Sequence, residues 1–309
     1  MQPNLGQSIS RNPPMNKSTY IRLSLGRITA ITGNTFTELT RLKTFYVVLL
    51  FSLLLIGNSV FMAQLTFQQE FQVLKDISLG SISIFSSLLA VVSTARLLPQ
   101  DLEDRTIYAI LAKPVARLEY LLGKLAGVLL LLAVSVTIMS LLFLFVLHLR
   151  EEIILRETMR QMSAAPPEQL AEGVRVVRNA AATLNLYPGI GIIYLKACLL
   201  AALTLFVSTF ATTTIFTTIV MVFVYLIGHL QAIAREYWLQ TNGIGWFSQV
   251  FLAFVTLFFP DLQLFNLVDD IVVGNVIPPT LLLKTVILGF FYTSFYLLLA
   301  WTVFYRREL

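Results

Sequence analysis

The chain has 309 residues, of which 57% are hydrophobic and 13% are charged, and its mean hydropathy is +0.78. Soluble domains carry about 25% charged residues, roughly twice that share. This composition excludes a disordered chain, a fibrous protein and an ordinary soluble enzyme, and it indicates one bundle of membrane-spanning helices. Nucleic-acid binding is not expected, because the net charge of +5 includes no basic cluster with interleaved aromatic residues.

The N-terminal region divides into a tail and a helix. Residues 1–26 contain the proline pair Pro13 and Pro14 and no long apolar run, so we expect a flexible cytoplasmic tail and no cleavable signal peptide. Residues 28–43 predict a helix lying on the inner leaflet and leading into the first span. The alternative is a plain extension of that span. The apolar residues that would share one side of this helix are Ile28, Ile31, Phe36 and Leu39.

Six apolar runs are long enough to cross a bilayer, which needs about 20 residues in a helix. They are residues 45–65, 77–98, 121–147, 192–210, 215–233 and 281–305. We expect the cations near their ends to extend toward the membrane surface; these are Arg96, Lys124, Lys196 and Lys284. A seventh run, residues 246–259, is short for a span and suits an interfacial or re-entrant segment, so seven spans remain the alternative.

The charges in the loops predict that both termini are cytoplasmic, because Lys and Arg are more frequent in the loops on that side. Residues 148–190 then form an external loop. Its charged segment 151–162 and its apolar periodicity over 168–184 predict two helices separated by a proline pair. These helices would serve as a binding face, a lid or a dimer contact.

The sequence contains none of the common catalytic or metal-binding motifs. The sequence lacks a complete phosphate-binding loop and the zinc, thiol and serine-hydrolase motifs HExxH, CxxC and GxSxG. His148, His229 and Cys198 have no metal-ligand spacing. We therefore expect no catalytic residue, no metal site and no cofactor on this chain. No carboxylate lies in the middle of a predicted span, which argues against a transporter driven by ions or protons.

The loop after the second span contains clear signals for the start and the end of a short helix. Pro99 is expected to end that span, and Asp101 to cap a short helix over residues 101–112 that ends before Pro114. The acids Glu103 and Asp104 suit its first turn. The pattern predicts a helix on the membrane surface with a charged cytoplasmic face, as a docking element for a cytosolic partner would need.

This region resembles the permeases of ATP-binding-cassette (ABC) type-2 exporters. The residues that carry the resemblance are Leu111, Pro114, Arg117, Tyr120, Gly123 and Lys124. Thr35, Phe36 and Glu38 match the helix that enters the first span in that family. The branch it resembles is that of the multi-copper enzyme maturation permeases, which includes the nitrous-oxide reductase maturation permease. That match rests on Pro260, Phe265, Asn266 and Leu267, and the whole resemblance covers most of residues 28–309.

The resemblance implies an all-α integral membrane protein with six transmembrane helices, an N-terminal interfacial helix, a cytoplasmic coupling helix and an external helical loop. Residues 27–309 would be one permease domain of a multi-pass bacterial inner-membrane protein that pairs with a second copy. Separate ABC ATPase subunits would hold ATP and magnesium, so the chain itself would not be an enzyme. Their contacts would be Asp101, Glu103, Asp104, Arg105, Tyr108, Lys113 and Arg117.

Small residues form a stripe at helical spacing in the second span, which suits close helix packing. The stripe comprises Gly80, Ser83, Ser87, Ala90 and Thr94. It predicts a dimer contact or a substrate path, with packing inside one subunit as the alternative. These patterns favour the function of an ABC exporter permease, and they do not identify its substrate. The alternative is an ABC-like membrane scaffold that transmits force to an external protein without moving a solute.

Overall fold

The computed structural model describes residues 17–65, 69–104, 116–163, 166–181, 185–240, 246, 259–275 and 277–306, without the side chains of 17–23 and 232–240. In these residues all regular structure is helical, as expected. The helices are α1 (Lys17–Thr40), α2 (Lys43–Gln64), α3 (Glu70–Ala95), α4 (Leu97–Glu103), α6 (Arg117–Gln161), α7 (Pro167–Ala181), α8 (Leu186–Phe210), α9 (Thr214–Gln240), the 3-10 helix η1 (Leu262–Phe265), α11 (Val268–Val273) and α12 (Pro279–Arg306).

Six helices are long and apolar enough to cross a membrane, and each coincides with all or most of one of the six predicted runs. They are α2, α3, α6, α8, α9 and α12. The described part of the chain therefore has the composition and architecture of a multi-pass membrane protein. Most of the ambiguous segment 246–259 lies outside the described residues.

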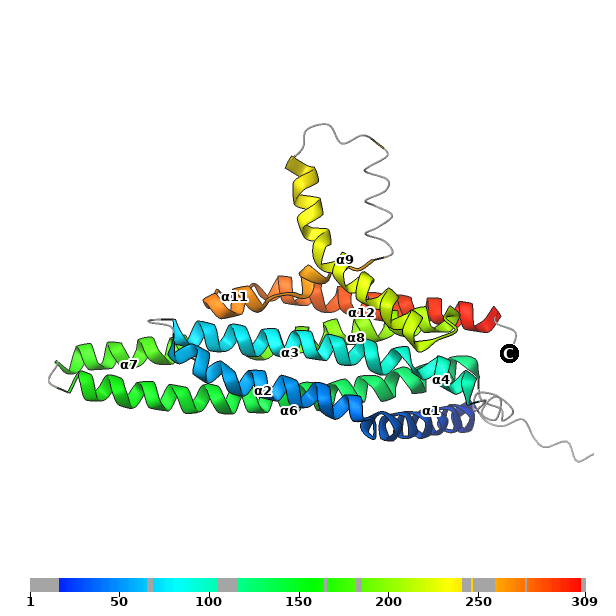
Figure 1. Ribbon diagram of the computed structural model, residues 1–309, viewed down its shortest axis with the longest axis horizontal. Helices are drawn as coiled ribbons and strands as arrows, with labels where there is room; N and C mark the ends of the chain where they lie inside the picture. The colour runs from blue at the N-terminus through cyan, green and yellow to red at the C-terminus, as the bar shows by residue number, and fades with distance from the viewer. Residues whose placement is uncertain are drawn as a thin grey trace, which may run out of the picture.

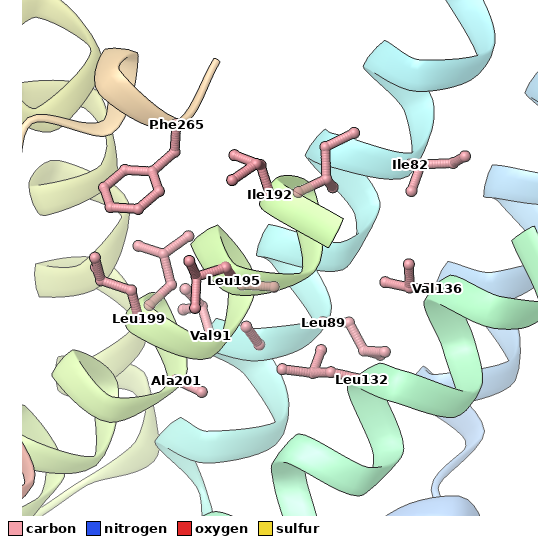
Figure 2. Close-up of a cluster of buried hydrophobic side chains, with 14 of the residues drawn as sticks. Ile82, Leu89, Val91, Leu132, Val136, Ile192, Leu195, Leu199, Ala201 and Phe265 are labelled. Atoms are coloured by element: carbon pink, nitrogen blue, oxygen red, sulfur yellow. The ribbon is translucent and has the colours of Figure 1, made fainter. Parts of the chain in front are cut away.

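Four of the spanning helices, α3, α6, α9 and α12, pack on α8, and α2 packs on α3 and α6. Five of the six run along the long axis of the molecule, whereas α9 crosses the others and its C-terminal end projects away from them (Figure 1). Figure 2 shows the core, in which leucine, isoleucine and valine side chains of α3 and α6 meet those of α8, with Phe265 from η1 beside them. Many large apolar side chains of α2, α9 and α12 are exposed, so these helices form much of the surface that lipid would cover.

α1 is a separate helix and does not continue α2, because the chain is extended at Leu42. It runs beside the first turns of α6, where two glycines permit close approach. A Cβ atom at Gly123 would lie 2.7 Å from Ile31, and one at Gly127 would lie 2.7 Å from Thr35. The predicted N-terminal helix therefore exists, but it begins at Lys17, and much of its apolar side packs on α6. The predicted tail is correspondingly shorter.

The segment that was predicted to form an external loop differs from the prediction in one respect. The predicted third span and the predicted first helix of that loop are a single helix, because α6 continues for 45 residues, about 67 Å at 1.5 Å per residue. The hydrocarbon core is only about 30 Å thick. α7 then folds back along α6 (Figure 1).

Two cations attach this α6–α7 hairpin to α3. The Arg150 guanidinium lies 2.6 Å from the Glu70 carboxylate, which joins α6 to the first turn of α3. The Lys75 ammonium donates a 2.6 Å hydrogen bond to the carbonyl of Ala180. That carbonyl belongs to the last turn of α7, where helical carbonyls lack partners and a positive charge is favourable. The hairpin is therefore fastened to the bundle at two points.

Two helix boundaries were predicted wrongly near prolines. α3 ends at Ala95, and Pro99 is the third residue of α4. α8 begins at Leu186, six residues before the predicted span, with Pro188 in its first turn. Proline is tolerated in a first turn because the amide hydrogen it lacks would have no helical partner there.

The earlier start of α8 changes the position of Lys196. This lysine is 2% exposed and lies about 15 Å along the axis of α8 from its first residue. The prediction that it lies near the end of its helix is therefore wrong, and its ammonium contacts Ser83 and His229 inside the bundle. Lys124 is likewise buried, at 2% exposure, whereas Lys284 is exposed near the start of α12.

The close contact between α1 and α6 can be tested with two alanine substitutions. Gly127→Ala should lower the free energy of unfolding by about 1–3 kcal/mol, because the new methyl group would overlap Thr35 and the backbone of α1. Gly57→Ala in α2 is the control, because nothing lies within 4 Å of its Cβ position, and it should leave stability unchanged or slightly raised. Thermal unfolding in mild detergent measures both. Equal effects would contradict the close approach.

Candidate functional site

Four of the residues predicted to contact an ATPase belong to the described part of the chain, and these lie at one end of the bundle. Asp101 and Glu103 belong to α4, Asp104 follows it, and Arg117 begins α6. The predicted helix over residues 101–112 overlaps α4 by three residues only. The rest of it lies outside the described residues, as do Arg105, Tyr108 and Lys113.

Asp101 is buried, and it bonds within the protein. Its carboxylate lies 2.7 Å from the Lys124 ammonium and accepts a hydrogen bond from the Tyr120 hydroxyl. Lys124 also lies 3.7 Å from the Glu38 carboxylate at the end of α1. Sequence reasoning placed Asp101 at a helix cap, whereas the structure makes it the centre of a cluster that joins α1, α4 and α6.

A second set of contacts joins the ends of α1, α6 and α12. The Arg117 guanidinium donates to the carbonyls of Phe304 and Tyr305 at 2.8 and 2.9 Å. These carbonyls belong to the last turn of α12, so the cation also offsets the negative end of the helix dipole. The Glu119 carboxylate accepts a 2.5 Å hydrogen bond from the Ser24 hydroxyl of α1. Both ends of the described chain therefore lie at the same end of the bundle (Figure 1).

Two predicted contact residues are available at the surface. Glu103 and Asp104 are exposed where α4 ends, one turn from buried Asp101. An external group that pairs with these carboxylates would be coupled through α4 to the buried Asp101–Lys124 pair. The arrangement suits a contact through which a bound partner moves α4.

The small residues of the α3 stripe lie in two different environments. Ala90 and Thr94 are fully buried in the core of the subunit, as the packing alternative expected. Gly80 and Ser83 line a polar cavity, and Ser87 lines an adjoining apolar groove. A Cβ atom at Gly80 would meet nothing within 4 Å, so this glycine borders open space.

Sequence reasoning missed the principal group in that cavity, which is Lys196. Its ammonium lies 3.2 Å from the Ser83 hydroxyl and 3.2 Å from Nε2 of His229. The cavity has a volume of about 270 Å³. Its lining comes from α3, α8, α9, the loop after η1 and α11, namely Asp76, Gly80, Ser83, Ile84, Lys196, Tyr225, His229, Asn266, Val268 and Asp269. A lysine within an apolar span was a sequence signal for this site. The span was predicted to start at residue 192, however, which placed Lys196 near the end of its helix.

Within the described residues, no group of three or more His, Cys, Asp or Glu side chains is arranged to hold a metal ion. Cys198 is a buried free thiol in α8. No protein-family model matches the chain, and no curated protein sequence matches it. The function must therefore be argued from the two sites described here.

The buried pair gives a direct test of how α4 is held. Lys124→Met should cost about 3–5 kcal/mol of stability, because it leaves the Asp101 carboxylate buried without its cation. Lys124→Met combined with Asp101→Asn should be more stable than Lys124→Met alone, because no charge is stranded and Tyr120 keeps an acceptor. Chemical unfolding in detergent gives the three free energies. A double variant that is no more stable than Lys124→Met alone would contradict a coupled ion pair.

Proposed function

We propose that this chain is the permease subunit of an ABC transporter of the type-2 exporter kind, which moves a substrate across or out of the membrane. Separate ATPase subunits would hydrolyse ATP, and a second copy of the chain would complete the membrane part. The protein would reside in the bacterial inner membrane with both termini cytoplasmic. The single observation that carries the proposal is the link from exposed acids on α4, through Asp101, to Lys124 in α6.

This link supports a mechanism in which a partner moves α4. α4 follows α3 directly across Arg96, so movement of α4 acts on α3 through the backbone. It acts on α6 through the ion pair and on α1 through the contact between Lys124 and Glu38. Binding and release of ATP by a partner docked on Glu103 and Asp104 would then shift three helices together. The energy for transport would come entirely from the partner.

Co-purification with an ABC-type ATPase encoded beside this chain tests the proposal. The expected complex contains two copies of each chain and hydrolyses ATP. Glu103→Lys with Asp104→Lys should weaken the complex and reduce complex-dependent turnover at least about tenfold, since each reversal replaces attraction with repulsion. Glu168→Lys with Glu172→Lys is the matched control, because both acids are exposed on α7 at the opposite end.

Wild-type assembly and turnover in the α4 double variant would contradict the assignment of this surface. Failure of the wild-type chain to bind the ATPase in every nucleotide state would contradict the exporter proposal as a whole. Thermal unfolding of each variant alone separates a lost contact from a lost fold.

A second candidate function is a scaffold that transmits force to an external protein. The observation that favours it is the α6–α7 hairpin, which extends the bundle and is fastened by Arg150 and Lys75. A scaffold would need such a rigid extension, and solute-stimulated ATP turnover would argue against it.

The fastening of the hairpin can be tested by limited proteolysis. Lys75→Met removes the donor to the last turn of α7 and should accelerate cleavage within residues 162–185 several-fold, while leaving the rest of the bundle protected. Lys284→Met, at an exposed lysine of α12, is the control. Equal cleavage rates in the two variants would show that Lys75 does not hold α7.

A further inference from the structure

The cavity around Lys196 contains a buried cation with an unused hydrogen-bond donor. The Tyr225 carbonyl lies 2.9 Å from Nδ1 of His229, and since a carbonyl only accepts, Nδ1 carries the proton. Nε2 of His229 then accepts from the Lys196 ammonium, and Ser83 accepts a second bond. An ammonium has three N–H groups. The third has no hydrogen-bond partner among the described residues, and the ammonium lies 5.7 Å from the centre of the Tyr225 ring in a cation–π contact.

Lys196 also lacks a directly paired carboxylate within the described part of the chain. Asp76 and Asp269 line the same cavity, but neither forms an ion pair with it at 4.0 Å or less. Both acids are exposed, whereas Lys196 is 2% exposed. A buried, unpaired cation in a spanning helix is costly and marks a functional site by default. An anionic group that enters the cavity would meet the lysine and leave the acids at the rim.

The polar cavity adjoins an apolar groove between α3 and α9, two of the helices that line the cavity. The groove has a volume of about 170 Å³ and shares Ile84 and Tyr225 with the cavity. Its other lining residues are Ser87, Leu88, Val91, Thr218, Met221, Val222 and Leu226. From Asp76 to Val91 the combined surface follows α3 for fifteen residues, about 22 Å. One leaflet of the hydrocarbon core is about 15 Å thick, so the surface is long enough for a head group and an acyl chain.

We propose that the groove between α3 and α9 binds a phospholipid with a zwitterionic head group. The phosphate would bond to Lys196 and Ser83, the head-group amine would face Asp76 and Asp269, and one acyl chain would lie along the apolar section. The distribution of charge favours this occupant, because the buried cation suits the phosphate and the two exposed carboxylates suit the head-group amine. The apolar groove next to them suits an acyl chain. That the bound lipid is also the cargo rests on the proposed transport function, whereas binding itself does not.

The burial of Lys196 distinguishes this site from ordinary lipid contact. Its side chain is 2% exposed and bonds to Ser83 of α3 and His229 of α9. A phosphate that reaches Lys196 would therefore lie between helices of the bundle and not against its outer surface.

The test is native mass spectrometry of the full chain in detergent, titrated with phosphatidylethanolamine or phosphatidylglycerol. The wild-type chain should bind one phosphatidylethanolamine preferentially. Lys196→Gln should weaken this binding about tenfold or more, whereas Lys284→Gln, at an exposed lysine, should not change it. Asp76→Asn with Asp269→Asn should remove the preference over phosphatidylglycerol, and both acids are exposed, so this variant should fold.

A third variant addresses the apolar section without touching a charge. Ile84 is 57% exposed where cavity and groove meet, so Ile84→Trp should fill the groove and reduce lipid binding even if Lys196→Gln fails to fold. Retained lipid binding with a changed proportion of dimer would show instead that the groove is an interface between copies. Equal competition by soluble glycerophosphoethanolamine would overturn the lipid assignment in favour of a soluble phosphate.

Equal affinity of the wild-type chain for the two lipids would overturn the role of the acids. Unchanged binding in both Lys196→Gln and Ile84→Trp would overturn the site itself. None of these measurements needs an ATPase, so their outcome is independent of the proposed transport function. Lipid binding without ATPase association would contradict the exporter proposal and leave the lipid site standing.

Discussion

The buried ion pair between Asp101 and Lys124 holds together one end of the molecule, and the other contacts at that end depend on it. Removing a carboxylate and an ammonium from water costs free energy. Their mutual attraction offsets this cost only when further hydrogen bonds satisfy the remaining donors and acceptors of both groups. Tyr120 and Glu38 supply these further contacts. The pair therefore fixes the position of α4 against α1 and α6. A force on α4 therefore reaches α6 through the Asp101–Lys124 pair, whose separation would leave two buried charges unpaired.

The two sites lie in different parts of the bundle and have opposite electrostatic character. The α4 surface presents acids to the surroundings over the buried Asp101–Lys124 ion pair, as a contact that must stay assembled requires. The Lys196 cavity contains an incompletely paired cation and open space beside Gly80, as befits a group that must exchange partners. α3 belongs to both, because it lines the cavity and leads directly into α4. A shift of α3 is the shortest physical route between them.

The six spans were predictable because length and apolar composition determine whether a helix crosses a bilayer. Boundaries were less predictable, since Pro99 and Pro188 lie in first turns and do not end the helices that contain them. The cluster around Asp101 was not predictable, because one of its partners, Glu38, lies 63 positions away and is brought near only by packing. The site around Lys196 was missed for a related reason. A lysine five residues inside an expected span suggests a membrane surface, and only three-dimensional packing shows which way it faces.

The length of α6 has a mechanical consequence. The helix contains no proline, and both of its glycines lie in its first three turns, so the remainder has none of the usual points at which helices bend. A rod of about 67 Å that tilts by about 5° at one end moves its other end by about 6 Å. Small rotations where Lys124 meets α4 would thus become displacements wider than a water molecule at the tip of the hairpin. The bundle can therefore amplify motion across the membrane with no flexible joint in this helix.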